Sequence, residues 1–386
     1  MQVSAEGHIS RAHFYEGLMR SAARFTYTKV AGILVDGDKT LRGQYALLAP
    51  YLENLYGVYH ALAKARAERG AIDFDNTETR VVFGEDHKIA SIQPLVRNDA
   101  HRLIEECMIA ANVEAARFLE KHQIPALYRV HAAPDADGLT ELRAFLGTLG
   151  LSLGGGMKPE AAHYAKLLDK VKSRPDKALI QTVLLRSLSQ AVYSPNNAGH
   201  FGLALSHYAH FTSPIRRYPD LLVHRAIRHV LRGGSAKNFL YSTTQMENLG
   251  SHCSMAERRA DEATRDAMDW LKAEYMQDKV GEEFDGLITG VLPFGLFVQL
   301  KDLYVEGLIH VTSLPSDYYS HDPVGHRMTG ERSGRIFRLT DPIRVRVSNV
   351  NLEEHKIDFE PVLSAREARV QRTSARRATS SRRKRR

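Results

Sequence analysis

Through the first 280 residues of the chain, apolar side chains recur mainly at intervals of three and four positions. This spacing places them along one face of an α-helix, so the pattern predicts amphipathic helices. The helical segments expected on this basis are residues 41–69, 98–123, 220–231 and 251–275. Strand-like pieces interrupt them at residues 71–83 and 127–131, and turn residues gather at 131–138, 153–159 and 194–199.

Beyond residue 280 the pattern changes to short runs in which apolar and polar residues alternate. A period of two places successive side chains on opposite faces of a strand, and several such runs at short spacing are typical of a small barrel. The expected strands are residues 284–292, 295–300, 307–311, 343–351 and 356–362. We therefore predict an α+β protein with a mainly helical part over residues 1–280, a five-stranded barrel over 281–361 and a tail over 362–386.

Composition sets the broad class of the protein. The chain has 386 residues, of which 43% are hydrophobic, so it can bury a large core. No apolar run approaches the roughly 20 residues that span a bilayer, and residues 1–11 lack the hydrophobic segment of a secretion signal. We therefore expect no membrane contact and a cytoplasmic location. The two cysteines, Cys107 and Cys253, are expected to be free thiols, and a cysteine-based zinc site is excluded.

The basic charge of the chain is concentrated in its tail. Lysine and arginine total 53 and aspartate and glutamate total 45, which gives a net charge of +8. Residues 366–386 carry ten of the basic residues and one of the acidic ones, so the remainder carries 43 and 44 and is close to neutral. We expect this tail to be disordered and to contact nucleic acid loosely, in a salt-dependent way. A tail that only keeps the protein soluble is the alternative.

The segment HFGLALSHYAHFTSPIRRYPDLLVH, residues 200–224, is the most informative in the chain. A Thr-Ser pair precedes Pro214, which is the order of a helix N-cap followed by proline at the first helical position. Arg216 and Arg217 would then lie in the first turn of the helix, where cations oppose the helix dipole. A bound anion, phosphate above all, explains both arginines. The alternative is that Arg217 pairs with Asp220 while Arg216 points into water.

Many residues of this segment resemble the signature of the RNase II/RNase R exoribonucleases, in the catalytic domain that those enzymes share. The matching positions are His200, Phe201, Gly202, Tyr208, Ala209, Phe211, Thr212, Ser213, Pro214, Arg216, Arg217, Tyr218, Asp220 and His224. The chain looks most like the RNase R branch, because the resemblance continues through ARFTYTKV, RNDAHRLIEECMIAANVEAARF and HCSMAERRADEATRD. It implies hydrolysis of RNA from the 3′ end to nucleoside 5′-monophosphates, with the help of magnesium.

The resemblance assigns roles to the residues around the two arginines. Arg216 matches the catalytic arginine that contacts the scissile phosphate, where the transition state needs charge stabilisation. Arg217 and Tyr218 are expected to take part in RNA binding and, with Asp220, to brace Arg216.

Two residues earlier in the chain match contacts to the terminal nucleotide. The resemblance suggests that Glu106 contacts the sugar and that Phe74 stacks on the last base. A carboxylate near the apolar face of a helix is costly without a partner, so a salt bridge to Arg102 is the alternative for Glu106. The alternative for Phe74 is a place in the core, as a strand residue.

The barrel has a resemblance of its own, to the OB-fold RNA-binding domain named after ribosomal protein S1. Phe294, Phe297 and His310 match the exposed aromatic and imidazole positions of that family, where bases stack on a sheet face. Phe297 could instead belong to the core, and Tyr304 is a weaker candidate for RNA contact.

The resemblance also implies a cluster of aspartates that binds magnesium and a tyrosine partner for the stacking phenylalanine. In the family both precede the segment that this chain matches. None of the acidic pairs here has the density of that cluster; they are Asp36/Asp38, Asp73/Asp75 and Asp135/Asp137. We therefore expect no metal ligands in this chain and interpret it as the C-terminal portion of an RNase R-like protein, with Met1 as an internal start.

The expected partners are single-stranded RNA and structured RNA with 3′ overhangs, with ribosomes as a further candidate. A non-catalytic RNA-binding or ribosome-binding module, built from the barrel and the tail, is the alternative function. A third interpretation is an inert fragment whose exposed core surface prevents stable folding.

Overall fold

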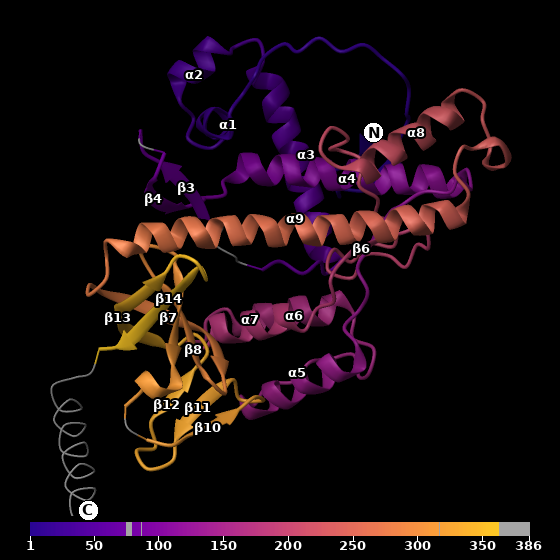
Figure 1. Cartoon of the computed structure of the whole chain (residues 1–386). Coiled ribbons are helices and arrows are strands. Elements are labelled where there is room, and N and C mark those ends of the chain that lie inside the picture. Colours follow the sequence, from indigo (N-terminus) through magenta and orange to yellow (C-terminus); the bar gives the residue numbers. More distant parts are fainter. Residues whose placement is uncertain (75–78, 86, 316, 363–386) are drawn as a thin grey trace, which may run out of the picture.

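The computed structural model describes residues 1–74, 79–85, 87–315 and 317–362. Its helices are α1 (Tyr27–Leu34), α2 (Lys39–Gln44), α3 (Ala49–Glu68), α4 (Asp99–Lys121), α5 (Ala136–Thr148), α6 (Ala161–Val171), α7 (Lys177–Arg186), α8 (Tyr218–Leu231) and α9 (Thr243–Gln277), with 3₁₀ turns at Ala236–Asn238 and Val311–Ser313. The long helix α9 runs between α1–α4 and α8 on one side and α5–α7 on the other, and a β-barrel lies at its C-terminal end (Figure 1). This arrangement confirms the expected α+β class.

Each segment expected to be helical is helical over most of its length, but the one at residues 41–69 is broken. There α2 ends at Gln44 and α3 begins at Ala49, with Pro50 in the first turn of α3. Proline is favoured at a helix start and removes a hydrogen bond in a helix interior, which explains the break. The hydrophobic pattern missed α1 and α5–α7.

The helical part also contains short antiparallel strand pairs. They are β1 (Gln2–Val3) with β2 (Ile9–Arg11), β3 (Thr79–Phe83) with β4 (Ile89–Pro94), and β5 (Tyr128–Val130) with β6 (Val192–Ser194). The strand expected around residues 127–131 is confirmed as β5. The strand expected over residues 71–83 begins only at Thr79 among the described residues.

The five strands expected after residue 280 are all present and close into a barrel. They are β7 (Glu283–Leu292), β8 (Gly295–Leu300), β9 (Glu306–His310), β13 (Pro342–Asn351) and β14 (Lys356–Pro361), in the order β13-β14-β9-β8-β7. A small sheet that the pattern missed is inserted between β9 and β13. It consists of β10 (Tyr319–Asp322), β11 (Arg327–Gly330) and β12 (Ile336–Arg338).

One continuous apolar core joins the helical part to the barrel. Leu146, Tyr164 and Ile180 of α5–α7 belong to the same buried cluster as Leu296 and Phe359 of the barrel, and we name this cluster the main core. A shared core fixes the barrel against α5–α7, because separating them would expose apolar surface on both sides. The barrel is therefore packed against the helical part and not joined to it by a linker alone.

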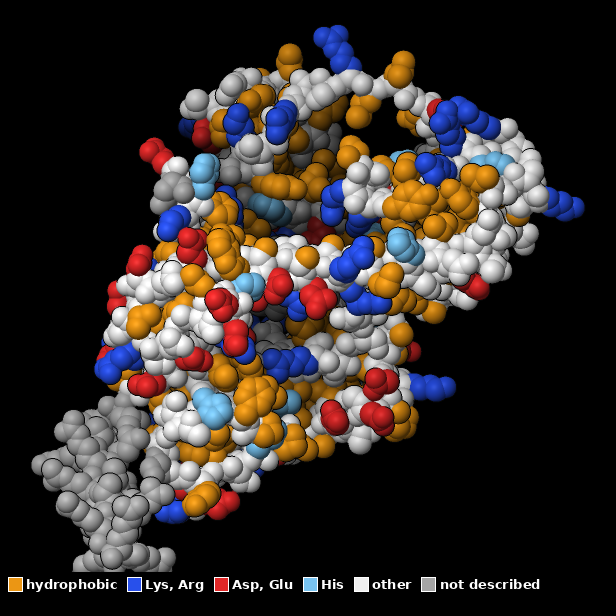
Figure 2. All heavy atoms as spheres, in the orientation of Figure 1, with side chains coloured by type: hydrophobic (Ala, Val, Ile, Leu, Met, Phe, Trp, Pro, Cys, Tyr) orange, Lys and Arg blue, Asp and Glu red, His pale blue; other side chains and the backbone are white. Residues whose placement is uncertain are grey.

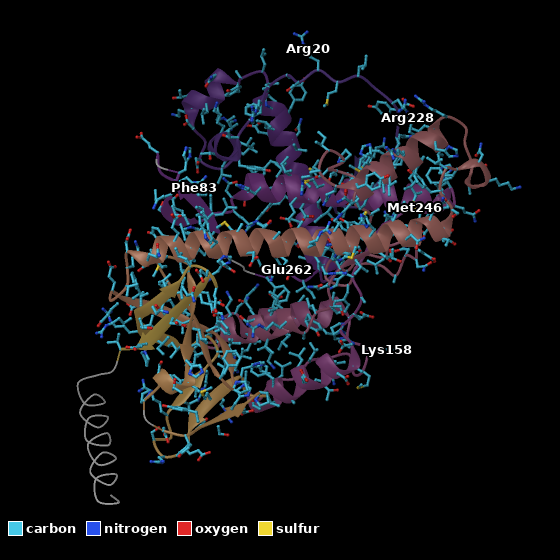
Figure 3. The ribbon with its side chains drawn as sticks, viewed as in Figure 1. Arg20, Phe83, Lys158, Arg228, Met246 and Glu262 are labelled. Atoms are coloured by element: carbon cyan, nitrogen blue, oxygen red, sulfur yellow. The ribbon has the colours of Figure 1, made fainter. Side chains whose placement is uncertain are left out.

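Helix α9 connects this core with a second one. Met246 and Cys253 near its start are buried beside β6 and α8, whereas Ala273 and Met276 near its end belong to the main core. Between them residues 258–267 are exposed around the whole helix, and Figures 2 and 3 show charged side chains along this stretch, with Glu262 near its middle. A helix that is polar all round is typical of a strut between two cores. Cys253 and Cys107 are free thiols, as expected.

No helix in the described ranges is long and apolar enough to cross a membrane. The cytoplasmic location expected from the sequence stays a prediction.

The packing of α9 on β6 can be tested at Gly250. A Cβ atom there would lie 2.6 Å from the carbonyl oxygen of Tyr193, whereas Gly57 of α3 has nothing within 4 Å of such an atom. Alanine favours a helix interior over glycine by about 1 kcal/mol, so Gly57→Ala should raise the free energy of unfolding by about that amount. Gly250→Ala should lower it by about 1 to 3 kcal/mol through overpacking. Urea unfolding measures both, and equal stabilisation by the two variants would contradict the close contact.

Candidate nucleic-acid interface

The prediction that a helix starts at Pro214, after a Thr-Ser N-cap, is wrong. Helix α8 begins four positions later, at Tyr218, and Pro219 occupies its first turn. Residues 214–216 form a turn instead. A helix that began at Pro214 would hold Pro219 in its interior, where proline removes a hydrogen bond and clashes with the preceding turn. The two arginines therefore precede the helix rather than lie inside its first turn.

Residues 208–217, which we name the arginine loop, are fixed on one side by α4. The side-chain amide of the buried Asn112 donates to the Tyr208 hydroxyl at 3.1 Å and accepts the Phe211 N–H at 2.9 Å. On the other side, Nε2 of His224 donates to the Phe211 carbonyl at 2.9 Å, and the two rings stack with centroids 4.3 Å apart. These contacts hold the loop in one path between α4 and α8.

Asp220 of α8 is the second anchor of the loop and is fully buried. Its Oδ1 atom accepts the Ser213 N–H at 2.8 Å and a guanidinium N–H of Arg217 at 2.8 Å. Arg217 thus makes the ion pair that the alternative interpretation of the sequence described. Arg216 is exposed, and its side chain has no hydrogen bond or ion pair within the described ranges. The loop presents one free guanidinium at its tip.

Tyr218 contacts a different arginine. Its ring is 43% exposed, and its hydroxyl accepts a hydrogen bond from Arg225 at 3.4 Å. The same guanidinium donates to the Tyr241 hydroxyl at 3.3 Å. Hydrogen bonding with Tyr241, together with desolvation, raises the pKa of Tyr218, so it is a neutral phenol at physiological pH. Its place on the surface leaves the ring open to a ligand.

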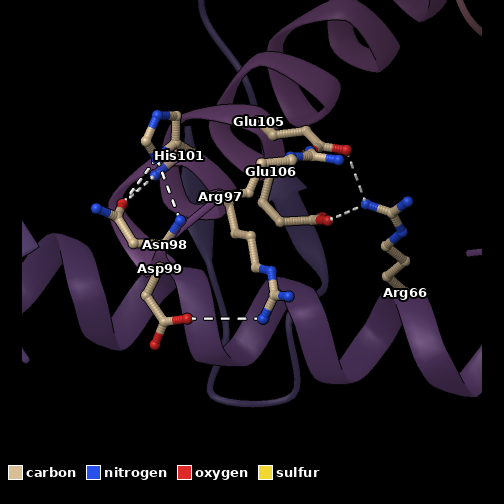
Figure 4. A network of polar contacts seen from close by, with 8 residues as sticks. Arg66, Arg97, Asn98, Asp99, His101, Glu105 and Glu106 are labelled. Atoms are coloured by element: carbon tan, nitrogen blue, oxygen red, sulfur yellow. Dashed lines mark hydrogen bonds and ion pairs between the residues drawn. The ribbon is translucent and has the colours of Figure 1, made fainter. Parts of the chain in front are cut away.

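Glu106 is buried on α4, with 5% of its surface exposed. Arg66 donates to its carboxylate at 2.7 Å and to the neighbouring Glu105 at 3.2 Å (Figure 4). The expected alternative partner is wrong, because Arg102 pairs with Asp99 at 3.7 Å. Burial disfavours the charge of Arg66, but the surrounding carboxylates outweigh it and raise the pKa of the guanidinium. Glu106 is therefore an ion-paired side chain inside the helical part.

Phe74 lies ahead of β3 and outside any strand, so its expected strand position is wrong. The side chain is half-buried and packs against the main core. Its neighbour Asp73 is close enough to Arg66 to contribute to the raised pKa of that guanidinium. The packing supports the core alternative for Phe74, and its stacking on a base stays a prediction.

Helix α4 sets the spacing between the carboxylate and the arginine loop. Glu106 and Asn112 are six positions apart on α4, which corresponds to about 9 Å along the axis. Both side chains are buried, and Asn112 is the residue that binds the loop. Helix α4 therefore holds Glu106 and the arginine loop at a fixed separation.

A cluster of aromatic and histidine side chains that includes Tyr208 and His210 of the arginine loop was not predicted from the sequence. The Tyr193 hydroxyl of β6 is hydrogen-bonded to Nδ1 of His210 at 2.9 Å, and the Tyr208 ring lies 5.2 Å from the His200 ring and 5.7 Å from the His210 ring. Burial, with help from neighbouring basic side chains, lowers the pKa of His200 to about 3 and that of His210 to about 2. Both imidazoles are neutral at physiological pH. The segment HYAHF supplies Tyr208 and His210, but Tyr193 and His200 come from elsewhere in the chain, so local spacing carries no signal for the cluster.

Arg129 of β5 connects this cluster to α9. Its guanidinium donates to both carboxylate oxygens of Glu257, at 2.6 and 3.2 Å, and lies 4.6 Å from the centroid of the Tyr193 ring. Ser254 of α9 accepts the Tyr193 N–H at 2.9 Å. The sequence did contain a signal for this ion pair, which is an arginine inside the apolar strand LYRVH. Such a charge needs a partner from elsewhere in the fold.

The three barrel residues singled out in the sequence come together at one edge. His310 lies opposite Gly295 in the β8–β9 pair, next to Phe294, and the rings of Phe294 and Phe297 meet edge to face with centroids 6.3 Å apart. The residues on both sides of Phe297 in β8 are fully buried, so the alternation of the strand turns Phe297 outward. Tyr304, the weaker candidate, packs against the main core.

The acidic pairs that were noted in the sequence do not form a cluster among the described residues. Asp38 and Asp135 accept backbone N–H groups at the starts of α2 and α5, which is ordinary helix capping. Asp73 lies near Arg66, and Asp75 falls outside the described residues. Within the described ranges no three histidine, cysteine, aspartate or glutamate side chains could hold a metal ion together. These residues therefore do not fit a magnesium site.

Known protein families match both parts of the fold. The RNB domain matches residues 1–233, and the S1 RNA binding domain matches residues 277–360. Ribonuclease R of Vibrio cholerae is 52% identical over 394 residues, a match that covers 100% of this chain and 48% of the relative. Ribonuclease R of Escherichia coli is 53% identical over 377 residues, covering 96% of this chain and 46% of the relative. The apo form of Mycoplasma genitalium RNase R has a TM-score of 0.77 at 26% identity, covering 88% of this chain and 53% of that one.

These matches define an RNB-domain protein that carries an S1 domain. More narrowly, the chain belongs to the RNase R family of exoribonucleases and corresponds to the C-terminal RNB and S1 region of its members. It spans about half the length of the curated relatives that it matches. The family resemblance predicted from the sequence is confirmed, as is the S1-type barrel.

The anchoring role of Asp220 can be tested by unfolding. Asp220→Ala leaves the half-buried Arg217 guanidinium and the Ser213 N–H without an acceptor, and should lower the free energy of unfolding by about 3 kcal/mol. Asp169→Ala is the control, because that carboxylate is 69% exposed and pairs with Lys172. An exposed pair of this kind contributes at most about 1 kcal/mol. Urea denaturation of both variants makes the comparison, and similar small losses would mean that Asp220 does not anchor the loop.

Proposed function

We propose that this chain supplies the phosphate-contacting and RNA-binding part of a 3′-to-5′ exoribonuclease of the RNase R type. Such an enzyme hydrolyses RNA processively from its 3′ end and releases nucleoside 5′-monophosphates. The observation that carries the proposal is the exposed guanidinium of Arg216, presented at the tip of a loop that Asp220 and His224 anchor. Membership of the RNase R family is the reason for proposing RNA hydrolysis as the reaction in which this guanidinium takes part.

In this proposal Arg216 is the catalytic residue that contacts the scissile phosphate. A guanidinium held at that position stabilises charge on the phosphate oxygens as the transition state forms. Arg217, bound to Asp220, acts as a positioning residue, because its ion pair fixes the backbone from which Arg216 extends. Tyr218 offers its exposed ring to RNA on the outer side of α8.

The remaining proposed contacts are to the terminal nucleotide and to bases further along the RNA strand. Glu106 accepts a hydrogen bond from the sugar of the terminal nucleotide, and Phe74 stacks on its base. Phe294, Phe297 and His310 form a stacking platform on the barrel for bases further along the strand. We assign residues 1–280 to the catalytic domain, 281–361 to the S1-type barrel and 362–386 to a basic tail, of which residues 363–386 lie outside the described ones.

We propose that a full-length enzyme of this type uses magnesium as its metal. The described residues of this chain do not fit its site, and the relatives are about twice as long as the chain. We propose that the metal ligands come from the part of the enzyme that this chain does not match. The binding groups and the metal would then reside in different segments.

Single-stranded RNA and structured RNA with 3′ overhangs are the proposed substrates. RNase R of Mycoplasma genitalium has been solved with ribose-methylated single-stranded RNA, and a second structure of it holds double-stranded RNA. Both structures match this fold at 26% and 25% identity, which supports transfer of the ligand class to this chain.

A non-catalytic RNA-binding or ribosome-binding module is the second candidate function. The S1 match and the pair formed by the exposed Phe294 and the half-buried Phe297 favour it, because both would operate without a nuclease centre. The two functions differ in one respect, which is whether bound RNA is shortened when the metal-binding segment of a relative is supplied.

The first functional prediction separates binding from hydrolysis. The chain by itself should bind 5′-labelled single-stranded RNA but degrade it slowly or not at all in magnesium, because the described residues do not fit a metal site. Joined to the preceding half of the Vibrio cholerae relative, it should shorten the same RNA to a very short end product. Gel electrophoresis of the labelled RNA measures both reactions. Fast degradation by the chain by itself would overturn the proposed division of labour.

In that joined protein Arg216→Ala should lower turnover at least roughly 100-fold while RNA affinity changes little, because the contact acts mainly in the transition state. Arg216→Lys should not restore turnover, since a point charge does not reproduce the planar fork of a guanidinium. Near-normal turnover in both variants would show that Arg216 is only a surface residue.

The third functional prediction distinguishes the tail from the barrel. Removing residues 366–386 should reduce the slope of log affinity against log salt by roughly 3, if four or five of its basic residues contact phosphates. Phe294→Ala should instead weaken RNA binding by about 1 to 3 kcal/mol at low and high salt alike, through lost stacking. Fluorescence anisotropy across a salt series measures both. An unchanged slope after truncation would identify the tail as a solubilising extension.

A further inference from the structure

His210 lies in the arginine loop, and its backbone position is fixed on both sides. Tyr208 and Phe211 flank it, and Asn112 of α4 binds both of these residues. Six positions further along the chain, Arg216 forms part of the exposed tip of the same loop. The imidazole is therefore held on the same rigid segment as the arginine proposed to contact RNA.

One ring nitrogen of His210 is already used. Its Nδ1 atom is 2.9 Å from the Tyr193 hydroxyl. Burial raises the pKa of Tyr193 to about 12, so the hydroxyl keeps its proton, and Nδ1 is its hydrogen-bond partner among the described residues. Tyr193 itself is fixed by Ser254 and by the guanidinium of Arg129 above its ring. A hydroxyl that donates to Nδ1 leaves the proton of the neutral imidazole on Nε2.

The other ring nitrogen has no partner. Within the described ranges Nε2 of His210 has no hydrogen-bond partner. The side chain is only half-buried. Arg217, Arg129 and Arg216 are close enough to disfavour a further positive charge on the ring, after burial itself. A neutral N–H donor among cations, with no acceptor of its own, is suited to an anionic ligand that the arginines also attract.

We propose that His210 contacts RNA directly, donating its Nε2–H to a phosphate oxygen of the strand bound at Arg216. This inference rests on the proposed function, because it deepens the description of the same phosphate site. Tyr193 is then a positioning residue, since its hydroxyl selects the tautomer that can donate. Arg129 positions Tyr193 in turn and, through Glu257, ties the site to α9.

The test compares variants that keep or remove the donor. His210→Phe keeps an aromatic ring without a donor, and it should weaken binding of a short single-stranded oligoribonucleotide by about 10-fold, the effect of one charge-assisted hydrogen bond. His210→Gln places an amide N–H near the position of Nε2 and should stay within about 3-fold of the unmodified chain. His252→Phe, which changes an exposed histidine of α9, is the matched control and should leave affinity unchanged. Fluorescence anisotropy gives the affinities, and thermal unfolding shows that each variant is folded. His210→Leu replaces His210→Phe if the latter does not fold.

A second measurement identifies the acceptor and the charge of the ring. Oligonucleotides with one methylphosphonate linkage at successive positions lack a charged acceptor there, and at one linkage the difference between the unmodified chain and His210→Phe should disappear. A neutral donor also predicts that this difference is constant between pH 6 and 8. A difference that falls as pH rises through about 6.5 would mean that His210 binds as an imidazolium, against the inference.

The outcomes separate this inference from the proposed function. If the unmodified chain binds no RNA, the proposed function fails. If it binds RNA and His210→Phe binds equally well, the proposed function stands and His210 is a structural residue of the loop. If Tyr193→Phe and His210→Phe weaken binding while His210→Gln does not, the donor role is supported.

Discussion

The buried carboxylate of Asp220 is the interaction on which the rest of the site depends. It accepts both a backbone N–H from Ser213 and a guanidinium N–H from Arg217, so one side chain closes the turn between them. Of two adjacent arginines, this leaves Arg216 exposed and available to a ligand. Without that acceptor, the guanidinium of Arg217 would lose its ion pair, and the turn at residues 214–216 would lose a hydrogen bond that fixes its shape.

The loop can be fixed because α4 and α8, which pack together in one buried cluster, hold it from two sides. Helix α4 carries both Asn112 and the buried Glu106, and α8 carries Asp220 and His224. Helix α9 then extends from this region to the barrel, where its last turns join the main core. The arginine loop and the aromatic edge of the barrel are thereby connected through packed elements, which suits the proposed binding of one polynucleotide to both.

The sequence predicted the barrel better than the helical part, for physical reasons. Strand alternation is local, and the five strands expected for the barrel all occur, whereas α5–α7 are short and share their buried core with the barrel. The start of α8 was misplaced because two prolines satisfy the same local rule. The partner of Glu106 was misassigned to Arg102 on its own helix, since Arg66 comes from α3, 40 positions earlier. The Tyr193–His210 pair joins distant segments, and local spacing carries no signal for it.

The central claim is that the two arginines have different roles, one structural and one toward RNA. Side-chain nitrogen-15 NMR of selectively labelled arginine, titrated with a short single-stranded RNA, tests it directly. The Nε resonance of Arg216 should shift with RNA in proportion to occupancy, while that of Arg217 stays in place because its guanidinium remains bound to Asp220. A shift of Arg217 with none at Arg216 would contradict the account.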